Sequence, residues 1–367
     1  MIKILLVTLQ GGSNYGNRLQ NYALQTVVER LECEVHNPCY YFEREVFIKE
    51  RIKHPIRVVL GFLHFSRFRQ LYCKMRRERT FRRFDKKYIH NRFRLSFEKA
   101  FLKDWRAYDA AISGSDQVWH RWHVLPKELE YFYLMFFPEA KRLTYAPSFG
   151  FEQFDPETIQ IHKRGLVGIR KLSCREKTAQ TLIRELTGRE AEVLCDPTLL
   201  LTADEWQGIS QKPRYSIPEH YVLEYFITDM DQELLEKTAK FAAEKGLPII
   251  NVFDCSDLTR FCTSPEEFLW LVNHADYVLT NSFHGCVFSI LFYTKFVVFG
   301  RGGEEKDTMF DRIRTLLHNF GMERRIYNGS IDVADEAIEM EALEAVLNTQ
   351  RMTAQVYLDE CAELWKK

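Results

Sequence analysis

Short apolar runs alternate with amphipathic stretches along most of the chain. Ile2–Thr8 is an apolar run typical of a buried strand, and a glycine-containing loop separates it from Leu19–Leu31, where apolar residues recur at helical spacing. The same order returns later, with further strands expected at 109–112, 142–146, 171–174, 221–227, 248–253, 277–280 and 295–299. This alternation predicts an α/β fold built on parallel strands.

Helix signals divide this pattern into two halves. A helix is expected over 232–245, and Ser264-Pro265-Glu266-Glu267 forms a capping box with proline at the first helical position of another. A long final helix is expected from Asp335 to about Leu364. We therefore expect two Rossmann-like domains, residues 1–195 and 196–367, facing a central crevice in which ligands of such sheets bind.

The overall composition indicates a globular protein inside the cell. The 51 Lys and Arg residues equal the 51 Asp and Glu residues, which argues against binding of nucleic acid through overall charge. The nine cysteines are scattered without a CxxC pair, as in reduced cytoplasmic proteins. No apolar run suits a signal peptide or approaches the ~18 residues of a membrane span, so a cytoplasmic location is expected.

The charge is nevertheless uneven, because residues 44–106 form a basic, aromatic-rich insertion. Between Arg44 and Arg106 there are 20 Lys and Arg residues against 6 Asp and Glu residues. Within it, Val58–Phe68 has few charges and a basic flank, as an interfacial helix would. One hypothesis is that this segment meets anionic lipid at the inner face of the plasma membrane, and a lipid-diphosphate-linked acceptor. The alternative is a solvated helical face; no RNA-binding module is recognisable, so no nucleic acid partner is expected.

Three polar motifs follow expected strands in the first half. Asn14-Tyr15-Gly16-Asn17-Arg18 lies before a helix, where backbone amides favour anions and Arg18 could add a charge; the alternative is a plain tight turn. Asp116 follows small residues at a strand end, which favours a site role over a helix N-cap. Arg175 at a strand–helix junction could hold carboxylate or phosphate, or form a surface pair with Glu176.

The strongest candidate for proton transfer is His284 in the second half. Asn281-Ser282-Phe283-His284-Gly285 follows an expected strand and precedes an apolar helix over 286–292, which would direct the imidazole into a cleft. Histidine titrates near neutral pH and serves as a general acid or base. No HExxH motif, Cys/His cluster or GxSxG motif is present, so neither a metal site nor a serine hydrolase is predicted.

Taken in order, these motifs resemble those of the polysaccharide pyruvyl transferase family. The blocks that carry the resemblance are 14–24, 113–119, 145–150, 173–176, 196–200, 280–285 and 310–314. The resemblance implies a fold like that of the GT-B glycosyltransferases, with the acceptor side in the first domain and the donor side in the second. It implies transfer of pyruvate from phosphoenolpyruvate, a co-substrate, to two sugar hydroxyls of a bacterial cell-surface polysaccharide or its lipid-linked precursor. No other cofactor is implied.

The resemblance also implies roles for individual residues. Family members often hold the donor with an Arg in the block matching Arg175 and use the His matching His284 as acid/base. Asn17 stands where many members carry Asp, and Ser282 stands where some carry Arg. Loss of the second charge implies that Arg301, Lys306 or Arg312 replaces it. With these, the expected site comprises His284 and Asp116 as catalytic residues, and as substrate-binding residues Asn14, Asn17, Arg18, Arg175, Ser282, Arg301, Lys306 and Arg312.

Two other functions are compatible with this architecture. A GT-B nucleotide-sugar glycosyltransferase would need a pocket for the nucleotide base and a diphosphate site in the second half. There Glu304-Glu305 could bind the hydroxyls of a ribose. A non-catalytic glycan-binding or scaffold protein would need no donor at all.

Overall fold

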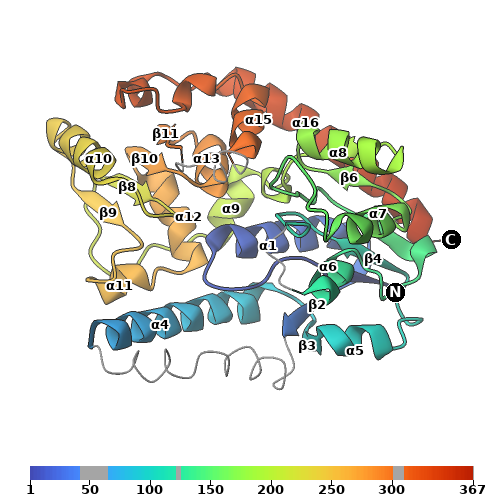
Figure 1. The fold of residues 1–367 in the computed structure, drawn as a ribbon. Helices are drawn as coiled ribbons and strands as arrows, with labels where there is room; N and C mark the ends of the chain where they lie inside the picture. The colour runs from blue at the N-terminus through green and yellow to red at the C-terminus, as the bar shows by residue number, and fades with distance from the viewer. Residues whose placement is uncertain (42–64, 121–124, 301–309, 367) are drawn as a thin grey trace. The chain divides into compact units, whose positions relative to one another are not determined.

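The chain forms two compact units in the computed structural model. The structure describes residues 1–41, 65–120, 125–300 and 310–366 (Figure 1). Unit 1 comprises Met1–Pro197 with Thr353–Lys367, and unit 2 comprises Thr198–Met352. The first boundary lies two residues after the expected one.

Unit 1 is built on a five-stranded parallel sheet with the order β3-β2-β1-β4-β5. The central strand β1 pairs with both β2 and β4, and Ile4, Leu5, Leu6 and Val7 are fully buried. A strand order that reverses beside β1 is typical of doubly wound α/β domains. The strands are β1 (Ile2–Val7), β2 (Cys33–Tyr41), β3 (Arg92–Ser96), β4 (Ala110–Ser113) and β5 (Arg142–Thr144).

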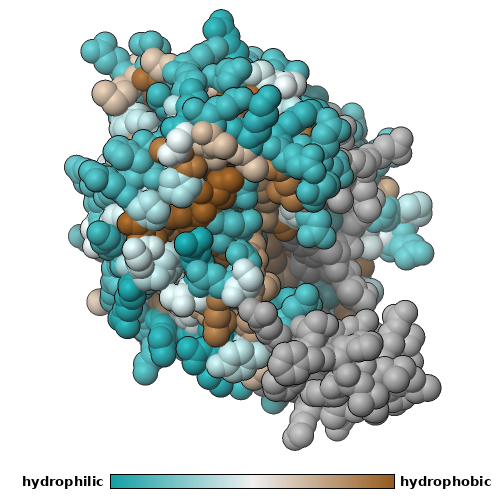
Figure 2. Space-filling model, turned by 90° about the vertical axis from the view of Figure 1, so that its left-hand side faces the viewer, coloured by the Kyte–Doolittle hydropathy of each residue, from teal (hydrophilic) through white to brown (hydrophobic). Residues whose placement is uncertain are grey.

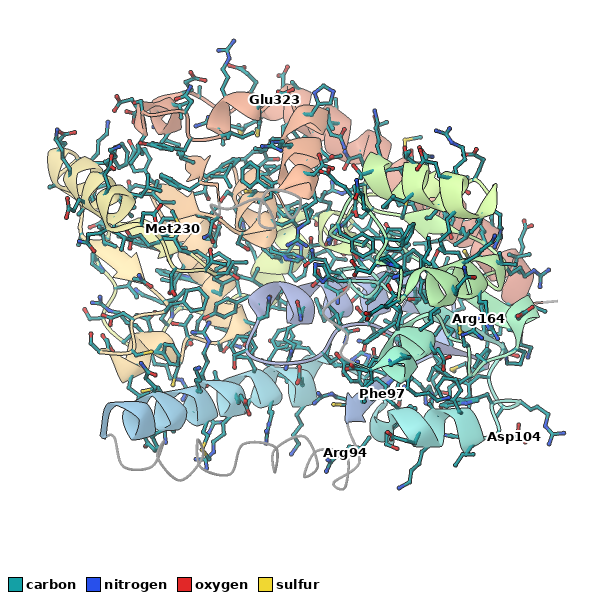
Figure 3. All side chains as sticks on the ribbon, in the orientation of Figure 1. Arg94, Phe97, Asp104, Arg164, Met230 and Glu323 are labelled. Carbon is teal, nitrogen blue, oxygen red and sulfur yellow. The ribbon has the colours of Figure 1, made fainter. Side chains whose placement is uncertain are left out.

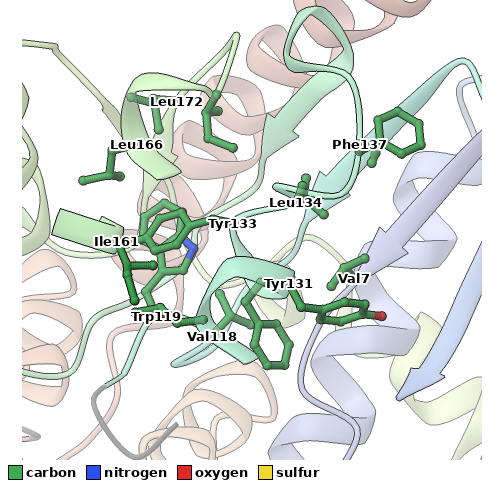
Figure 4. Close-up of a cluster of buried hydrophobic side chains, with 14 of the residues drawn as sticks. Val7, Val118, Trp119, Tyr131, Tyr133, Leu134, Phe137, Ile161, Leu166 and Leu172 are labelled. Carbon is green, nitrogen blue, oxygen red and sulfur yellow. The ribbon is translucent and has the colours of Figure 1, made fainter. Parts of the chain in front are cut away.

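Helices and a small second sheet complete unit 1. The helices are α1 (Tyr15–Glu29), α4 (Phe65–Tyr88), α5 (Phe97–Leu102), α6 (Pro126–Phe132), α7 (Ile159–Val167) and α8 (Lys177–Thr187). The small sheet pairs β6 (Ser173–Cys174) with β7 (Glu192–Val193). The core is aromatic: Trp119 stacks on Tyr133 with 4.9 Å between ring centroids (Figure 4). Gly165 lies against this ring, since a Cβ there would come within 2.2 Å of Tyr133 Cγ.

Unit 2 is built on a four-stranded parallel sheet with the order β11-β10-β8-β9. The capping box expected at Ser264 is confirmed, because the Ser264 hydroxyl accepts from the Glu267 amide and starts α12. The strands are β8 (Val222–Tyr225), β9 (Ile249–Asn251), β10 (Tyr277–Thr280) and β11 (Phe296–Val298). The helices are α9 (Ala203–Ile209), α10 (Gln232–Glu244), α11 (Leu258–Phe261), α12 (Pro265–His274), α13 (Phe283–Leu291) and α15 (Asp311–Asn319).

The final helix, α16 (Met340–Trp365), belongs to both units. It starts later than expected, because residues 332–335 form a separate 3₁₀ turn. The sequence placed the whole helix in the second domain, whereas its last part belongs to unit 1. The reason is that the end of the helix binds residues of unit 1 that are distant in the sequence. The Tyr357 hydroxyl donates to the Thr144 carbonyl at 2.9 Å, and Lys171 pairs with Glu360.

Figure 2 shows one face of the molecule. Hydrophilic residues predominate on this face and surround a smaller patch of hydrophobic residues. Across the described ranges, no helix combines the length and apolar character needed to cross a membrane.

Candidate functional site

The segment with His284 connects β10 to α13 in unit 2. The Ser282 hydroxyl accepts from the Gly285 amide at 3.4 Å, so Ser282 is the N-cap and α13 starts at Phe283. The sequence placed His284 in a loop before a helix starting at Cys286. It lies instead in the first helical turn, because serine caps the helix three residues earlier than the apolar pattern indicates. A short strand and a buried helix therefore fix the His284 backbone.

Hydrogen bonds hold this connection against the end of β8. The Thr280 hydroxyl donates to the Tyr225 carbonyl at 2.7 Å and accepts from the Ser282 amide at 3.0 Å. A Cβ on Gly285 would lie 2.4 Å from Thr280 Oγ1, so only glycine allows this close approach. The Asn281 carboxamide oxygen accepts from the Ile227 amide at 2.7 Å. Two side chains of the connection, those of Thr280 and Asn281, thus bind it to the end of β8 and to the residues that follow β8.

His284 and Arg312 lie against the same aromatic ring. The His284 imidazole meets Phe283 edge-on, with 5.3 Å between ring centroids, and is only 6% exposed. The guanidinium carbon of Arg312, on α15, lies 5.5 Å from the Phe283 centroid. The N-terminus of α13 carries the positive end of the helix dipole. Unit 2 therefore brings together a buried imidazole, a guanidinium and a helix N-terminus, an arrangement of groups that suits a small anionic ligand.

A second cluster surrounds Arg175 in unit 1. Arg175 Nη1 lies 2.7 Å from Asp196 Oδ2, while Asp116 and Glu176 each have an oxygen 3.8 Å from the guanidinium. The Ser115 hydroxyl donates to Asp196 at 3.2 Å. The four charged residues come from three of the motif blocks identified in the sequence. The blocks therefore meet as one buried ion cluster, in which Arg175 is central.

The cluster changes how Arg175 is interpreted. Burial alone would lower the pKa of Arg175, but the carboxylates of Asp196, Asp116 and Glu176 outweigh it and raise the pKa of the guanidinium. Among the described residues, the ion pairs of this cluster join one cation to three carboxylates. Pairing with Glu176, predicted for the surface, occurs inside the unit. The prediction that Arg175 holds a donor anion stays a prediction, and that anion would compete with Asp196.

Asp116 has a strained backbone. Its φ of 74° lies in the left-handed region that few residues other than glycine adopt. Its carbonyl accepts from the amides of Val118 and Ser148, which hold this conformation. No helix starts at Asp116, so the N-cap alternative is wrong. Left-handed residues of this kind are more common at functional sites, which supports its inclusion among the candidates.

The motif at the start of α1 contains an ordinary helix N-cap. The Asn14 side chain accepts from the Asn17 amide at 3.2 Å. Arg18 is buried, pairs with Asp85 on α4 at 2.9 Å and donates to the Gly11 carbonyl at 3.0 Å. Burial lowers the pKa of Arg18, although Asp85 opposes this. Arg18 therefore joins α1 to α4.

The predicted residues divide between the two units. Asn14, Asn17, Arg18, Asp116 and Arg175 lie in unit 1. Ser282, His284 and Arg312 lie in unit 2. Arg301, Lys306 and the pair Glu304-Glu305 lie outside the described residues, as does most of the expected interfacial helix Val58–Phe68.

Sequence reasoning gave no role to Asp85, Asp196 and Asn281. Asp85 could have been noticed as a rare carboxylate within a basic helical stretch. Asp196 was one residue of a family-like block, and nothing in the sequence pairs it with Arg175. Over residues 1–41, 65–120, 125–300 and 310–366, no group of three or more His, Cys, Asp or Glu residues is arranged to hold a metal ion.

A family model described as polysaccharide pyruvyl transferase matches residues 14–303, a range that includes both the Arg175 cluster and the His284 segment. The chain belongs to the polysaccharide pyruvyl transferase family. The family resemblance expected from the motifs is thereby confirmed. No curated protein matches the chain.

Solved structures similar to this pyruvyl transferase family member include two epimerases. UDP-GlcNAc 2-epimerase from Methanocaldococcus jannaschii has 12% identity over 96% of this chain and 93% of its own, with a TM-score of 0.48. A protein from Listeria monocytogenes, provisionally named UDP-N-acetylglucosamine 2-epimerase, has 10% identity over 94% of both chains and a TM-score of 0.48. Because both TM-scores are below 0.5, the α/β fold with parallel sheets is assigned from the strand topology of this chain.

Proposed function

We propose that this enzyme transfers pyruvate from phosphoenolpyruvate to two hydroxyls of one sugar, forming a pyruvyl ketal on a bacterial cell-surface polysaccharide or its lipid-linked precursor. The observation that carries the proposal is the family match over residues 14–303, which spans the candidate residues of both units. Within that range His284 is a buried imidazole on a rigid helix end.

In the proposed reaction His284 is the general acid. It delivers a proton to the methylene carbon of phosphoenolpyruvate, so that C2 becomes electrophilic. One sugar hydroxyl adds to C2, the C2–O bond to phosphate breaks, and a second hydroxyl closes the ketal. The two hydroxyl protons restore His284 and leave with the phosphate, so the reaction needs no oxidant or reductant.

The donor carries several negative charges and needs cations and amide donors. Arg18 and Arg175 each already have a carboxylate oxygen within 3 Å, from Asp85 and Asp196. An incoming anion would have to displace these partners. We therefore assign the donor to the N-terminus of α13 in unit 2, with Arg312 as a cation beside this turn, since its guanidinium carbon lies 5.5 Å from the Phe283 ring centroid.

The proposed lipid-linked acceptor suits the exposed face of α4. This face carries Lys74, Arg76, Arg79, Arg82, Arg83, Lys86 and Lys87, with Glu78 as the one exposed acid between residues 72 and 88. Basic helices of this kind are attracted to anionic lipid headgroups, and salt screens that attraction. We propose that this face brings the enzyme to the inner surface of the plasma membrane.

Sedimentation with anionic liposomes tests the membrane proposal. Arg79→Gln/Arg83→Gln should bind more weakly than the wild type, by about 1 kcal/mol for each cation at the surface. Lys237→Gln/Lys240→Gln, which removes two exposed charges from α10, should bind as the wild type does. Equal binding by all three proteins, or wild-type binding that salt does not weaken, would contradict the proposal.

Phosphorus-31 NMR distinguishes the proposed reaction from glycosyl transfer. With a glycan acceptor, the wild type should release phosphate from phosphoenolpyruvate, and His284→Gln should do so far more slowly. Release of a nucleoside diphosphate from a sugar nucleotide, with phosphoenolpyruvate unchanged, would favour a glycosyltransferase instead.

A further inference from the structure

A charged cavity lies in unit 1, whereas the residues assigned above to the donor belong to unit 2. It has a volume of about 700 Å³ and lies between the C-terminal half of α4 and the strands β2 and β3. Ligand pockets typically fall between about 300 and 1,000 Å³. The cavity is therefore large enough for an organic molecule and not only for an ion.

Four cationic side chains line this cavity in two pairs. Arg82 and Lys86 are one helical turn apart on α4, so they share a face of the helix. Arg92 and Arg94 are two residues apart on β3, so they share a face of the strand; Arg94 is labelled in Figure 3. Arginine forks and lysine ammonium groups are the usual ligands of phosphate.

The single carboxylate in the cavity wall is already neutralised. Asp85 is 2% exposed and lies between Arg18 Nε at 2.9 Å and Arg92 Nη2 at 3.1 Å. Four cations and one carboxylate give the lining a formal charge of +3, and Arg18 behind Asp85 adds further positive charge. A ligand with two or more negative charges is the complement of this wall.

Three apolar side chains, with Cys39 and Asn91, form the rest of the wall. Ile89 is buried, and Tyr40 and Phe93 are half-buried and also pack against the hydrophobic core of unit 1. Tyr40 stays neutral, because burial raises its pKa to about 12. These groups offer contact to an organic substituent but no carboxylate that would repel an anion.

We propose that this cavity binds a diphosphate joined to an organic group. Two cation pairs match two phosphate groups, and the apolar wall receives the substituent. The diphosphate could belong to a lipid-linked molecule or to a soluble nucleotide. The site goes beyond the proposed pyruvyl transfer and does not depend on it, because its test uses neither phosphoenolpyruvate nor a sugar.

Isothermal titration calorimetry with inorganic pyrophosphate, at about 150 mM salt, tests the site in the full-length protein. The wild type should bind pyrophosphate with saturation and orthophosphate about tenfold more weakly. Lys86→Gln/Arg94→Gln should weaken pyrophosphate binding by about tenfold or more, since each lost charge-assisted hydrogen bond changes affinity by that order. Lys237→Gln/Lys240→Gln is the control, with the same loss of charge at exposed positions of α10 in unit 2, and should change affinity less than about twofold.

Two results would overturn the proposal: no saturable binding of pyrophosphate by the wild type, or equal weakening in the cavity and control variants. If the double variant fails to fold, Lys86→Gln alone replaces it, because Lys86 is exposed. Titrations with farnesyl diphosphate and uridine diphosphate then show which organic group the cavity accepts. The compound that binds with the higher affinity shows whether the substituent is a lipid or a nucleoside. Pyrophosphate binding without phosphate release from phosphoenolpyruvate would leave the site standing and refute only the pyruvyl transfer.

Discussion

Replacing Arg175 by methionine should destabilise unit 1 strongly. The change removes the guanidinium that contacts the buried carboxylates of Asp116, Glu176 and Asp196, of which Asp196 is fully buried. Removing one partner of a buried ion pair typically costs about 3–5 kcal/mol, because the remaining charge is left uncompensated. For a domain of about 150–250 residues, that loss lowers the melting temperature by about 6–20 °C.

Urea denaturation and thermal unfolding at pH 7 measure this loss. The control is Arg184→Met, which removes an exposed arginine from α8 and should change the free energy of unfolding by less than about 0.5 kcal/mol.

Arg175→Lys separates structure from donor binding. Lysine keeps the charge but loses the planar fork, so it should destabilise less than methionine. If Arg175 also holds the donor, as the sequence predicts, KM for phosphoenolpyruvate should rise strongly in this variant while the protein remains folded. A loss below about 1 kcal/mol for Arg175→Met, the value of an exposed pair, would refute the buried-cluster reasoning.

Two further predictions concern unit 2. His284→Gln should lower kcat by about 10²–10⁴-fold with little change in donor affinity or melting temperature, and a lower melting temperature with normal turnover would assign His284 a structural role. Burial raises the pKa of Glu224, although the hydrogen bond from the Thr238 hydroxyl opposes this. The protonated carboxyl of Glu224 therefore stabilises the fold at acid pH. This stabilisation is lost as the pH rises from about 4.5, the ordinary pKa, through the raised pKa of the folded state. Glu224→Gln cannot ionise and should therefore gain stability relative to the wild type between about pH 4 and pH 7 in urea denaturation; a constant difference would contradict the assignment.

Elements with strong local signals were predictable from the sequence. The expected strands at 2–8, 109–112 and 277–280 coincide closely with β1, β4 and β10. The helix expected over 232–245 is α10, and Gly246 just beyond its end adopts φ 68°. Apolar runs, capping residues and glycine ends depend on neighbours in the sequence, so no tertiary information was needed.

Contacts between distant segments were not predictable in the same way. The sequence predicts Arg18 as an anion-binding charge at a helix start, yet Arg18 pairs with Asp85, 67 residues away. Arg175 reads as an anion ligand, yet Asp116 and Asp196 approach it from other blocks. Pairings of this kind depend on strand order and helix packing, which the spacing of one sequence does not specify.

Mass spectrometry of a glycan acceptor incubated with phosphoenolpyruvate tests the central claim most directly. The reaction should add the mass of one pyruvyl ketal to the acceptor and release one phosphate for each ketal formed, and His284→Gln should abolish most of this gain. The assignment of pyruvyl transfer would be contradicted if the mass of the acceptor stayed unchanged with phosphoenolpyruvate and the same acceptor gained a hexose from a sugar nucleotide.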